Sequence, residues 1–274
     1  MKKIIVLLSL SASALVFSQA TRFVYQVTMK PNANDKSDVK TELAYLDVTP
    51  EKSVFVSEKS VKRDSLMERM RATNNFSFNR EQMDALRSNI NYTIEKDLIN
   101  QKTSHKQRIG RDAYTYEEDR TLEWKILPET MMIDQYKAQK ASTTFAGRVW
   151  NAWFTMDIPF QDGPYKFSGL PGLVLKVEDE QGDYSFDLRE SKKIEALAST
   201  QQRGTVVKLK RKDFEKQQDK FQKDPSSFFN GAMMGGGRPG GNRQPDPNRM
   251  REMENRIKEE IAKNNNPIEL PEKK

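Results

Sequence analysis

The chain has 274 residues, of which 36% are hydrophobic, and this is enough for one domain with its own core plus appendages. It contains no cysteine, which excludes disulfides, thiol catalysis and metal sites built on cysteine ligands. The formal net charge is +7, but the positive excess lies in residues 203–274. That tail lacks aromatic residues interleaved with its basic ones, so no nucleic-acid binding is expected.

Residues 1–18 have the order of a secretory signal peptide. Two lysines are followed by an apolar run over residues 4–17, and small residues then precede polar sequence. Cleavage is predicted after Ser18 or after Ala20. The apolar run is too short for a comfortable membrane span, so we expect an exported chain, periplasmic or secreted, with no transmembrane anchor in its mature form.

Residues 19–210 are predicted to form one β-rich domain, because short segments rich in β-branched and aromatic residues alternate in polarity along them. Helical spacing is seen only near residues 62–71, with a cap at Asp64 or Ser65, and near 83–90. The pattern favours a mainly β fold, a curved antiparallel sheet or open half barrel with a few short helices. The predicted strands cover residues 23–29, 43–48, 53–57, 92–94, 108–118, 122–127, 136–145, 148–156, 173–178, 184–188 and 206–209.

Residues 211–274 are predicted to be a helical and glycine/proline-rich C-terminal extension. A polar helix is expected over 212–222 and a charged helix over 249–263, whose apolar residues form one stripe. Glycine and proline dominate residues 231–248, which we expect to be flexible. The extension is therefore expected to dock weakly on the β-rich domain.

A proline–glycine turn lies between two apolar segments after residue 168. Pro171 presets φ for the second position of a type II turn, and Gly172 accepts the positive φ of the third position. The flanking leucines place this turn in a hydrophobic setting, so we assign it a structural role. The turn residues are Gly169, Leu170, Pro171, Gly172 and Leu173.

With its neighbouring segments, this turn resembles the signature of the GLPGLI family of secreted Bacteroidota proteins. The resemblance is carried by residues 148–155, 157–159, 163–167, 169–174 and 266–270. Val174 stands where isoleucine is usual. The resemblance implies an envelope protein, often encoded near outer-membrane transport systems, without established catalytic residues. The strand pattern is also similar, at the level of fold, to lipoprotein-carrier-like half barrels.

Aromatic residues gather between residues 150 and 167. Trp150 and Trp153 have opposite parity within one strand and so point to opposite faces of the sheet. One is expected to fill the core and the other to line the mouth of a groove. The ligand-binding candidates, for an apolar or peptide ligand, are Trp150, Trp153, Phe154 and Tyr165.

No catalytic residue, metal site or cofactor is predicted. His105 is the only histidine, it lies in a polar stretch that we expect to be exposed, and the sequence contains no nucleophile elbow for it to serve. One histidine without cysteine leaves only carboxylates for zinc, which is a poor ligand set. Two alternatives stay open. One is copper(I) at Met131 and Met132, Met233 and Met234, or Met250 and Met253, and the other is calcium at the acidic turn 178–183, where solvated charge is expected.

These features favour a non-catalytic periplasmic or envelope binding or accessory protein. Its groove would bind a ligand, or its sheet edge would bind a partner such as an outer-membrane transporter. The alternative is a carboxylate-dependent hydrolase of the envelope, since two carboxylates about 5–9 Å apart leave no trace in a sequence. Converging polar groups in the concavity would favour the hydrolase, and an apolar lining would favour the binding protein.

Overall fold

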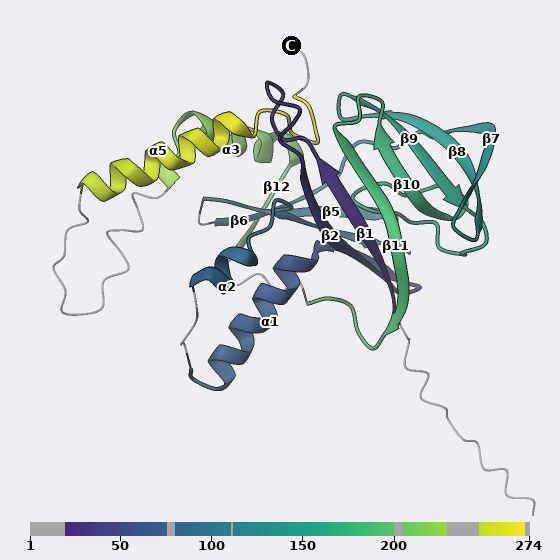
Figure 1. Cartoon of the computed structure of the whole chain (residues 1–274), viewed down its shortest axis with the longest axis horizontal. Helices are drawn as coiled ribbons and strands as arrows, with labels where there is room; N and C mark the ends of the chain where they lie inside the picture. The colour runs from purple at the N-terminus through teal and green to yellow at the C-terminus, as the bar shows by residue number, and fades with distance from the viewer. Residues whose placement is uncertain (1–19, 76–79, 111, 200–204, 229–246, 272–274) are drawn as a thin grey trace, which may run out of the picture.

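The computed structural model describes residues 20–75, 80–110, 112–199, 205–228 and 247–271 (Figure 1). Twelve strands form one sheet in these parts of the chain, in the order β12-β6-β5-β4-β3-β2-β1-β11-β10-β9-β8-β7. The predicted mainly β fold with an open, curved sheet and a few helices is confirmed. The predicted signal peptide and residues 231–246, with Met233 and Met234, lie outside the described residues.

The strands and helices fall in chain order as follows. The first six strands are β1 (Ala20–Met29), β2 (Lys40–Val48), β3 (Lys52–Ser57), β4 (Tyr92–Asp97), β5 (Lys102–Ile109) and β6 (Asp112–Glu117). The next six are β7 (Lys125–Ile133), β8 (Tyr136–Phe145), β9 (Arg148–Thr155), β10 (Leu173–Asp179), β11 (Tyr184–Ile194) and β12 (Val206–Leu209). The helices are α1 (Glu58–Ala72), α2 (Arg80–Ala85), α3 (Arg211–Lys223) and α5 (Pro247–Lys263).

The sheet consists of two antiparallel meanders that meet at β1, and β12 lies beside β6 in parallel at one end. Strand β1 pairs with β2 on one side and with β11 on the other. Residues 118–124 join β6 to β7, which lie on opposite sides of the β1–β11 pair. A loop of that length spans about 25 Å at most, so the two sides of the sheet must curve toward each other. Figure 1 shows β5 and β6 on one side of β1 and β11, and β7–β10 on the other.

The side chains of β1 alternate between the two faces of the sheet, which explains why the main core lies on the concave face. Phe23, Tyr25 and Val27 belong to the main buried cluster, whereas Val24 belongs to a smaller cluster on the other face, with Tyr45. A β-bulge between Val24 and Tyr25, opposite β11, adds local twist and bending. The inner face of the curved sheet therefore encloses most of the apolar side chains, and α1 packs against β2 and β3.

The loop between β9 and β10 fills part of the concavity instead of running over the surface. We call residues 156–172 the core loop. Its Tyr165, Lys166 and Phe167 are at most 2% exposed, and the ring of Phe167 lies 4.7 Å from that of Trp150, centroid to centroid. Buried loops are rare because their polar groups need partners within the protein, so the partners of this loop define the site described below.

The core loop ends in a turn of a different type from the one predicted. The N–H of Gly172 donates to the carbonyl of Leu170 at 2.8 Å, which closes a three-residue turn centred on Pro171 in place of a type II turn. Gly172 has φ +155°, and a Cβ atom there would lie 1.9 Å from the carbonyl oxygen of Thr155. This contact with β9 is tertiary, so local turn rules could not anticipate it.

The C-terminal part of the chain returns to the sheet. Helix α3 packs against β5 and β6, and α5 leads into residues 264–271, which we call the terminal segment. The N–H of Asn266 donates to the carbonyl of Pro31, and the N–H of Leu270 donates to that of Ala146, both at 2.9 Å. The predicted extension thus ends in contact with the β-rich domain. Among the described residues, no helix is long and apolar enough to cross a membrane.

Candidate functional site

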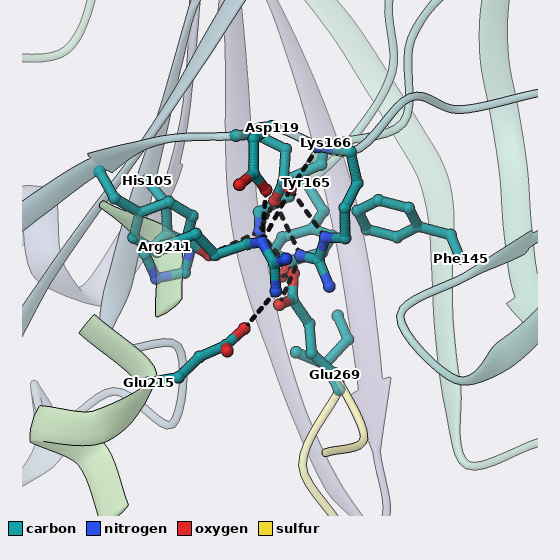
Figure 2. Close-up of polar contacts among 12 residues, drawn as sticks. His105, Asp119, Phe145, Tyr165, Lys166, Arg211, Glu215 and Glu269 are labelled. Carbon is teal, nitrogen blue, oxygen red and sulfur yellow. Dashed lines mark hydrogen bonds and ion pairs between the residues drawn. The ribbon is translucent and has the colours of Figure 1, made fainter. Parts of the chain in front are cut away.

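Charged side chains from three distant parts of the chain meet on the concave side of the sheet (Figure 2). Lys166 belongs to the core loop, Glu118 and Arg120 follow β6, and Glu269 lies in the terminal segment. The Nζ atom of Lys166 lies 2.6 Å from Oε2 of Glu118 and also forms an ion pair with Glu269. Arg120 bridges the same two carboxylates, at 2.7 and 2.9 Å. We call these four residues the Lys166 cluster.

Hydroxyl groups complete the hydrogen bonding of the cluster. Tyr165 donates its Oη–H to Glu269, and Lys166 donates to Oη of Tyr116 at 2.8 Å. Arg211, near the start of α3, extends the network toward solvent. It forms ion pairs with Asp119 and Glu215, and its Nε lies 3.9 Å from Oε1 of Glu118. In Figure 2, the ring of Phe145 lies on one side of the cluster and His105 on the other.

Both carboxylates of the cluster are held in the ionised form. Burial alone would raise the pKa of Glu118, but the hydrogen bond from Arg120 and the charge of Lys166 lower it to about 2. The same two cations lower the pKa of Glu269 well below its usual range, again against the effect of burial. A general acid must carry a proton near neutral pH, and neither carboxylate does.

A second buried ion pair anchors the beginning of the core loop. Lys96 of β4 lies 2.5 Å from Oδ1 of Asp162 and donates to the carbonyl of Gly163 at 2.7 Å. Burial lowers the pKa of Lys96, and the charge of Asp162 opposes that effect. The core loop is therefore held at two points by buried ion pairs with other elements, through its own Asp162 at one point and its own Lys166 at the other.

His105 is buried, which corrects the expectation that it is exposed. It is 5% exposed, and its ring stacks on Tyr116 with the centroids 4.9 Å apart. Its Nε2 lies 3.1 Å from Oε1 of Gln107, while Nδ1 has no hydrogen-bond partner among the described residues. The neighbours Ser104 and Lys106 point to the opposite face of β5, so the polar stretch reflects one face of a strand.

Because His105 is buried, stability should depend on pH in a defined window. Burial, helped by the charge of Lys166, lowers the pKa of His105 to about 4 in the folded chain, against 6.5 as its ordinary value. The contribution is fully present above about pH 6.5 and is lost as the pH falls toward 4, because only the unfolded chain then gains the proton. We expect a loss of roughly 2 kcal/mol between pH 7 and pH 5, measured by urea unfolding.

The variant His105→Gln should lack this decrease, since glutamine does not titrate. The carboxylates of the Lys166 cluster stay ionised in the folded chain over the same window, so they do not mask the effect. Identical pH profiles for the two proteins would contradict the burial of a neutral imidazole.

Two cavities adjoin the Lys166 cluster. The first, of about 330 Å³, lies between β1, β4, β5, α3 and the terminal segment, and we call it the aromatic cavity. Its lining includes Tyr92, Tyr165, Tyr184, Asn91, Gln107 and Gln218. The second, of about 900 Å³, is lined by Lys96, Lys166, Arg120 and Gly169 among others, and we call it the charged cavity. The concavity thus contains converging polar groups, but these groups pair with one another.

The four predicted ligand-binding residues separate into different environments. Trp150 and Phe154 lie in the main core, and Trp153 lies on the opposite face of β9, with Nζ of Lys140 5.9 Å from its ring centroid. Tyr165 lines the aromatic cavity. The opposite orientation of the two tryptophans agrees with their parity, and ligand binding by the four residues stays a prediction.

In the acidic turn between β10 and β11, Asp179 and Asp183 are buried, whereas Glu180 is exposed as expected for solvated charge. Asp179 and Asp183 are each 2% exposed and lie 2.8 and 3.4 Å from Nη1 of Arg148. The other oxygen of Asp179 accepts the N–H groups of Asp183 and Tyr184. The guanidinium of Arg148 on β9 therefore lies where calcium was considered. Among the described residues, no group of three or more His, Cys, Asp or Glu side chains that could hold a metal ion is found.

Sequence reasoning missed the Lys166 cluster, because its members are far apart in the chain. The available signal was Lys166 itself, a lysine between Tyr165 and Phe167 in an otherwise apolar motif. Because the neighbouring Tyr165 and Phe167 are both buried, Lys166 between them must lie inside the protein or at the boundary of its core. A buried lysine then requires acids nearby, which the sequence could indicate but not locate.

The fold and the site together describe an open β-sheet protein whose concave side is filled by its own loop. A sequence model of the family described as "Protein of unknown function (Porph_ging)" matches residues 146–176, which contain β9, the core loop and the beginning of β10. No curated protein matches this chain.

Two structures of PNGF-II, in the C2 and P21 space groups, are similar to this chain in fold. Each gives a TM-score of 0.50 with 18% sequence identity, over 73% of this chain. The matched part is 32% and 33% of the PNGF-II chain, so this chain spans about a third of its length. At this identity the likeness shows the fold alone.

Proposed function

We propose that this chain is a non-catalytic binding or accessory protein of the cell envelope. The observation that carries the proposal is the mutual pairing of the charges in the Lys166 cluster. Its two acids are kept ionised and the adjacent His105 is kept neutral, so none of these three groups holds the proton that a general acid would donate near neutral pH. The cluster serves to seat the core loop, and the neighbouring aromatic cavity is left for a ligand.

The lining of the aromatic cavity suits a ligand with an apolar or ring face and neutral polar groups, such as a peptide. The rings of Tyr92 and Tyr165 meet edge to face, with centroids 5.2 Å apart. Neutral amides such as Gln107 and Gln218 add donors and acceptors, and the carboxylates of Glu215, Glu260 and Glu269 line the same cavity. Its walls therefore combine ring faces with many polar groups, which suits a ligand with several hydrogen-bonding groups.

A substitution that fills the aromatic cavity tests this proposal. Gln218→Trp should weaken the binding of neutral aromatic tripeptides, measured by saturation-transfer NMR, by roughly tenfold or more, because the larger ring occupies their space. Gln217→Trp is the matched control, since Gln217 is also half-buried on α3 but does not line the cavity. Equal binding by both variants would remove the cavity as the site. Peptide or ester hydrolysis that Glu118→Gln abolishes would support the hydrolase alternative instead.

An envelope location is part of the same proposal. It is supported by the signal-peptide pattern of residues 1–18 and by the resemblance to the GLPGLI family. We propose that the mature chain begins at Gln19 or Thr21, which N-terminal sequencing of the protein from fractionated cells would establish.

The open edge of the sheet is the surface we propose for an envelope partner such as an outer-membrane transporter. Strand β7 is the last strand of the sheet order, so one of its sides has no strand paired to it within the part of the chain that the structure describes. Ile126, Met131 and Met132 of this strand are exposed, Met132 to 61%. An edge with exposed apolar side chains can accept an added strand from another protein.

A further inference from the structure

The terminal segment lies in a cleft in the manner of a bound peptide. Arg148, buried at the start of β9, donates from Nη2 to Oδ1 of Asn266 at 2.6 Å and to the carbonyl of Pro267 at 2.7 Å. Its Nε donates to the carbonyl of Ile268 at 3.1 Å. One guanidinium thus contacts three consecutive residues of the segment. Its Nη1 faces the two aspartates of the β10–β11 turn, which fix its orientation independently of the segment.

The position of Asn266 is specific for an asparagine. Its side-chain amide donates to the carbonyl of Lys30 at 2.8 Å and to Oδ2 of Asp183 at 3.0 Å. Its N–H donates to the carbonyl of Pro31, and its carbonyl accepts the Oη–H of Tyr184 at 2.6 Å. An aspartate at this position would place a second carboxylate against Asp183 and would lose both donated bonds.

A carboxylate-binding site receives the other end of the segment. Lys166, Arg120 and Tyr165 converge on the carboxylate of Glu269. Between the two ends, Ile268 packs against the main core. The contacts of the cleft therefore match the sequence pattern Asn-Pro-apolar-Glu. Arg148 contacts the asparagine end, and Lys166 and Arg120 bind the glutamate carboxylate.

The terminal segment is held by its own contacts, not by the helix before it. In the described part of α5, residues 248 and 251–263, each side chain is exposed or half-buried, so the helix is poorly anchored on the β-rich domain. The segment forms no strand or helix of its own. It is thus a peptide ligand that is tethered to the chain through α5.

We propose that this cleft is a peptide-recognition site for an Asn-Pro-apolar-Glu sequence, that residues 266–270 occupy it in cis, and that the same segment of a second copy is the partner it binds in trans. When two copies exchange this identical segment, each contact of the cleft is made again with the partner's segment. A second copy is therefore the partner whose binding costs the least free energy in lost contacts. The inference goes beyond the proposed function and does not depend on any ligand of the aromatic cavity.

The test uses the full chain with a protease site inserted between Lys263 and Asn264, which are both exposed. The protein is cut after folding, so the cleft is never empty, and a fluorescent peptide of residues 264–271 is added in excess. Fluorescence polarisation should show saturable replacement of the cut segment. Peptides with Asn266→Asp or Glu269→Lys should bind at least roughly tenfold more weakly, because each loses charge-assisted hydrogen bonds.

The control peptide carries Asn264→Asp, the same chemical change at an exposed position, and should bind within about twofold of the native peptide. Equal binding by all four peptides would overturn sequence recognition. Failure of the native peptide to enter, while circular dichroism shows the cut protein still folded, would overturn exchange itself.

The partner in trans is tested with full-length protein. In excess over the cut protein, the uncut chain should displace the cut segment and form a complex of one cut and one uncut chain, seen by sedimentation velocity. Uncut chain carrying Asn266→Asp should not form it. Peptide exchange without any such complex would refute the second copy as the partner while leaving the peptide site in place.

Discussion

Gly172→Ala should lower the free energy of unfolding by roughly 3–4 kcal/mol or more, whereas Gly169→Ala should lower it by only about 1 kcal/mol. Both glycines lie in the core loop and both have positive φ, +155° and +88°. A Cβ atom at position 172 would overlap the carbonyl oxygen of Thr155, which is backbone and cannot swing aside. Around position 169 the corresponding space is empty within 4 Å, so alanine there causes backbone strain alone.

Urea unfolding of the two variants beside the native protein measures this difference directly. The larger loss at Gly172 should come with weaker pairing of β9 and β10, visible as faster amide hydrogen exchange in both strands. Similar losses for the two glycines would mean that the turn does not lie tightly against β9.

The second large effect is expected for Lys166→Met, with a loss of about 3–5 kcal/mol in the free energy of unfolding. Without Lys166, Glu118 and Glu269 remain largely buried and share Arg120 as the cation of the cluster. Removing one partner of a buried ion pair is costly because the other charge stays buried without full compensation.

Lys176→Met is the matched control, because Lys176 also pairs with a glutamate, at 2.8 Å from Glu178, but near the surface. The side chains of that pair are 31% and 38% exposed, so the control should lose less than about 1 kcal/mol. Adding Glu269→Gln to Lys166→Met should restore part of the stability, since a neutral amide replaces the uncompensated carboxylate. If both lysine variants lost equally little in chemical denaturation, the cluster would not hold the core loop.

The strands could be predicted because their signal is local. Alternation along residues 23–29 and the turn between residues 178 and 184 identify β1 and the β10–β11 hairpin without any knowledge of distant contacts. The first residue of α1 was harder to predict from the sequence. This helix begins at Glu58, directly after β3, with Oγ of Ser57 accepting the N–H of Ser60, and not at the predicted cap near residue 64. Ser57 is thus both the last residue of β3 and the N-cap of α1. Hydrophobic periodicity in the sequence does not show where the strand ends and the helix begins.

The candidate site could not be predicted because charged residues are expected at the surface, and their burial depends on partners far along the chain. Lys96 pairs with an acid 66 residues away, and Lys166 with one 103 residues away. The pairing appears only after the sheet has curved and the core loop has entered it. The aromatic residues were the easier signal, but Trp150 and Phe154 serve the core.

The position of β1 at the centre of the sheet has a consequence for the order of events during synthesis. Of the described strands, β1 leaves the ribosome first, yet one of its two neighbours, β11, is not made until residues 184–194. Until then the nascent chain carries an unpaired strand edge, which invites pairing with other chains, and the long separation slows the closing contact. Productive folding should therefore wait until residues 184–194 have been made, and chaperones that shield extended polypeptides should raise its yield.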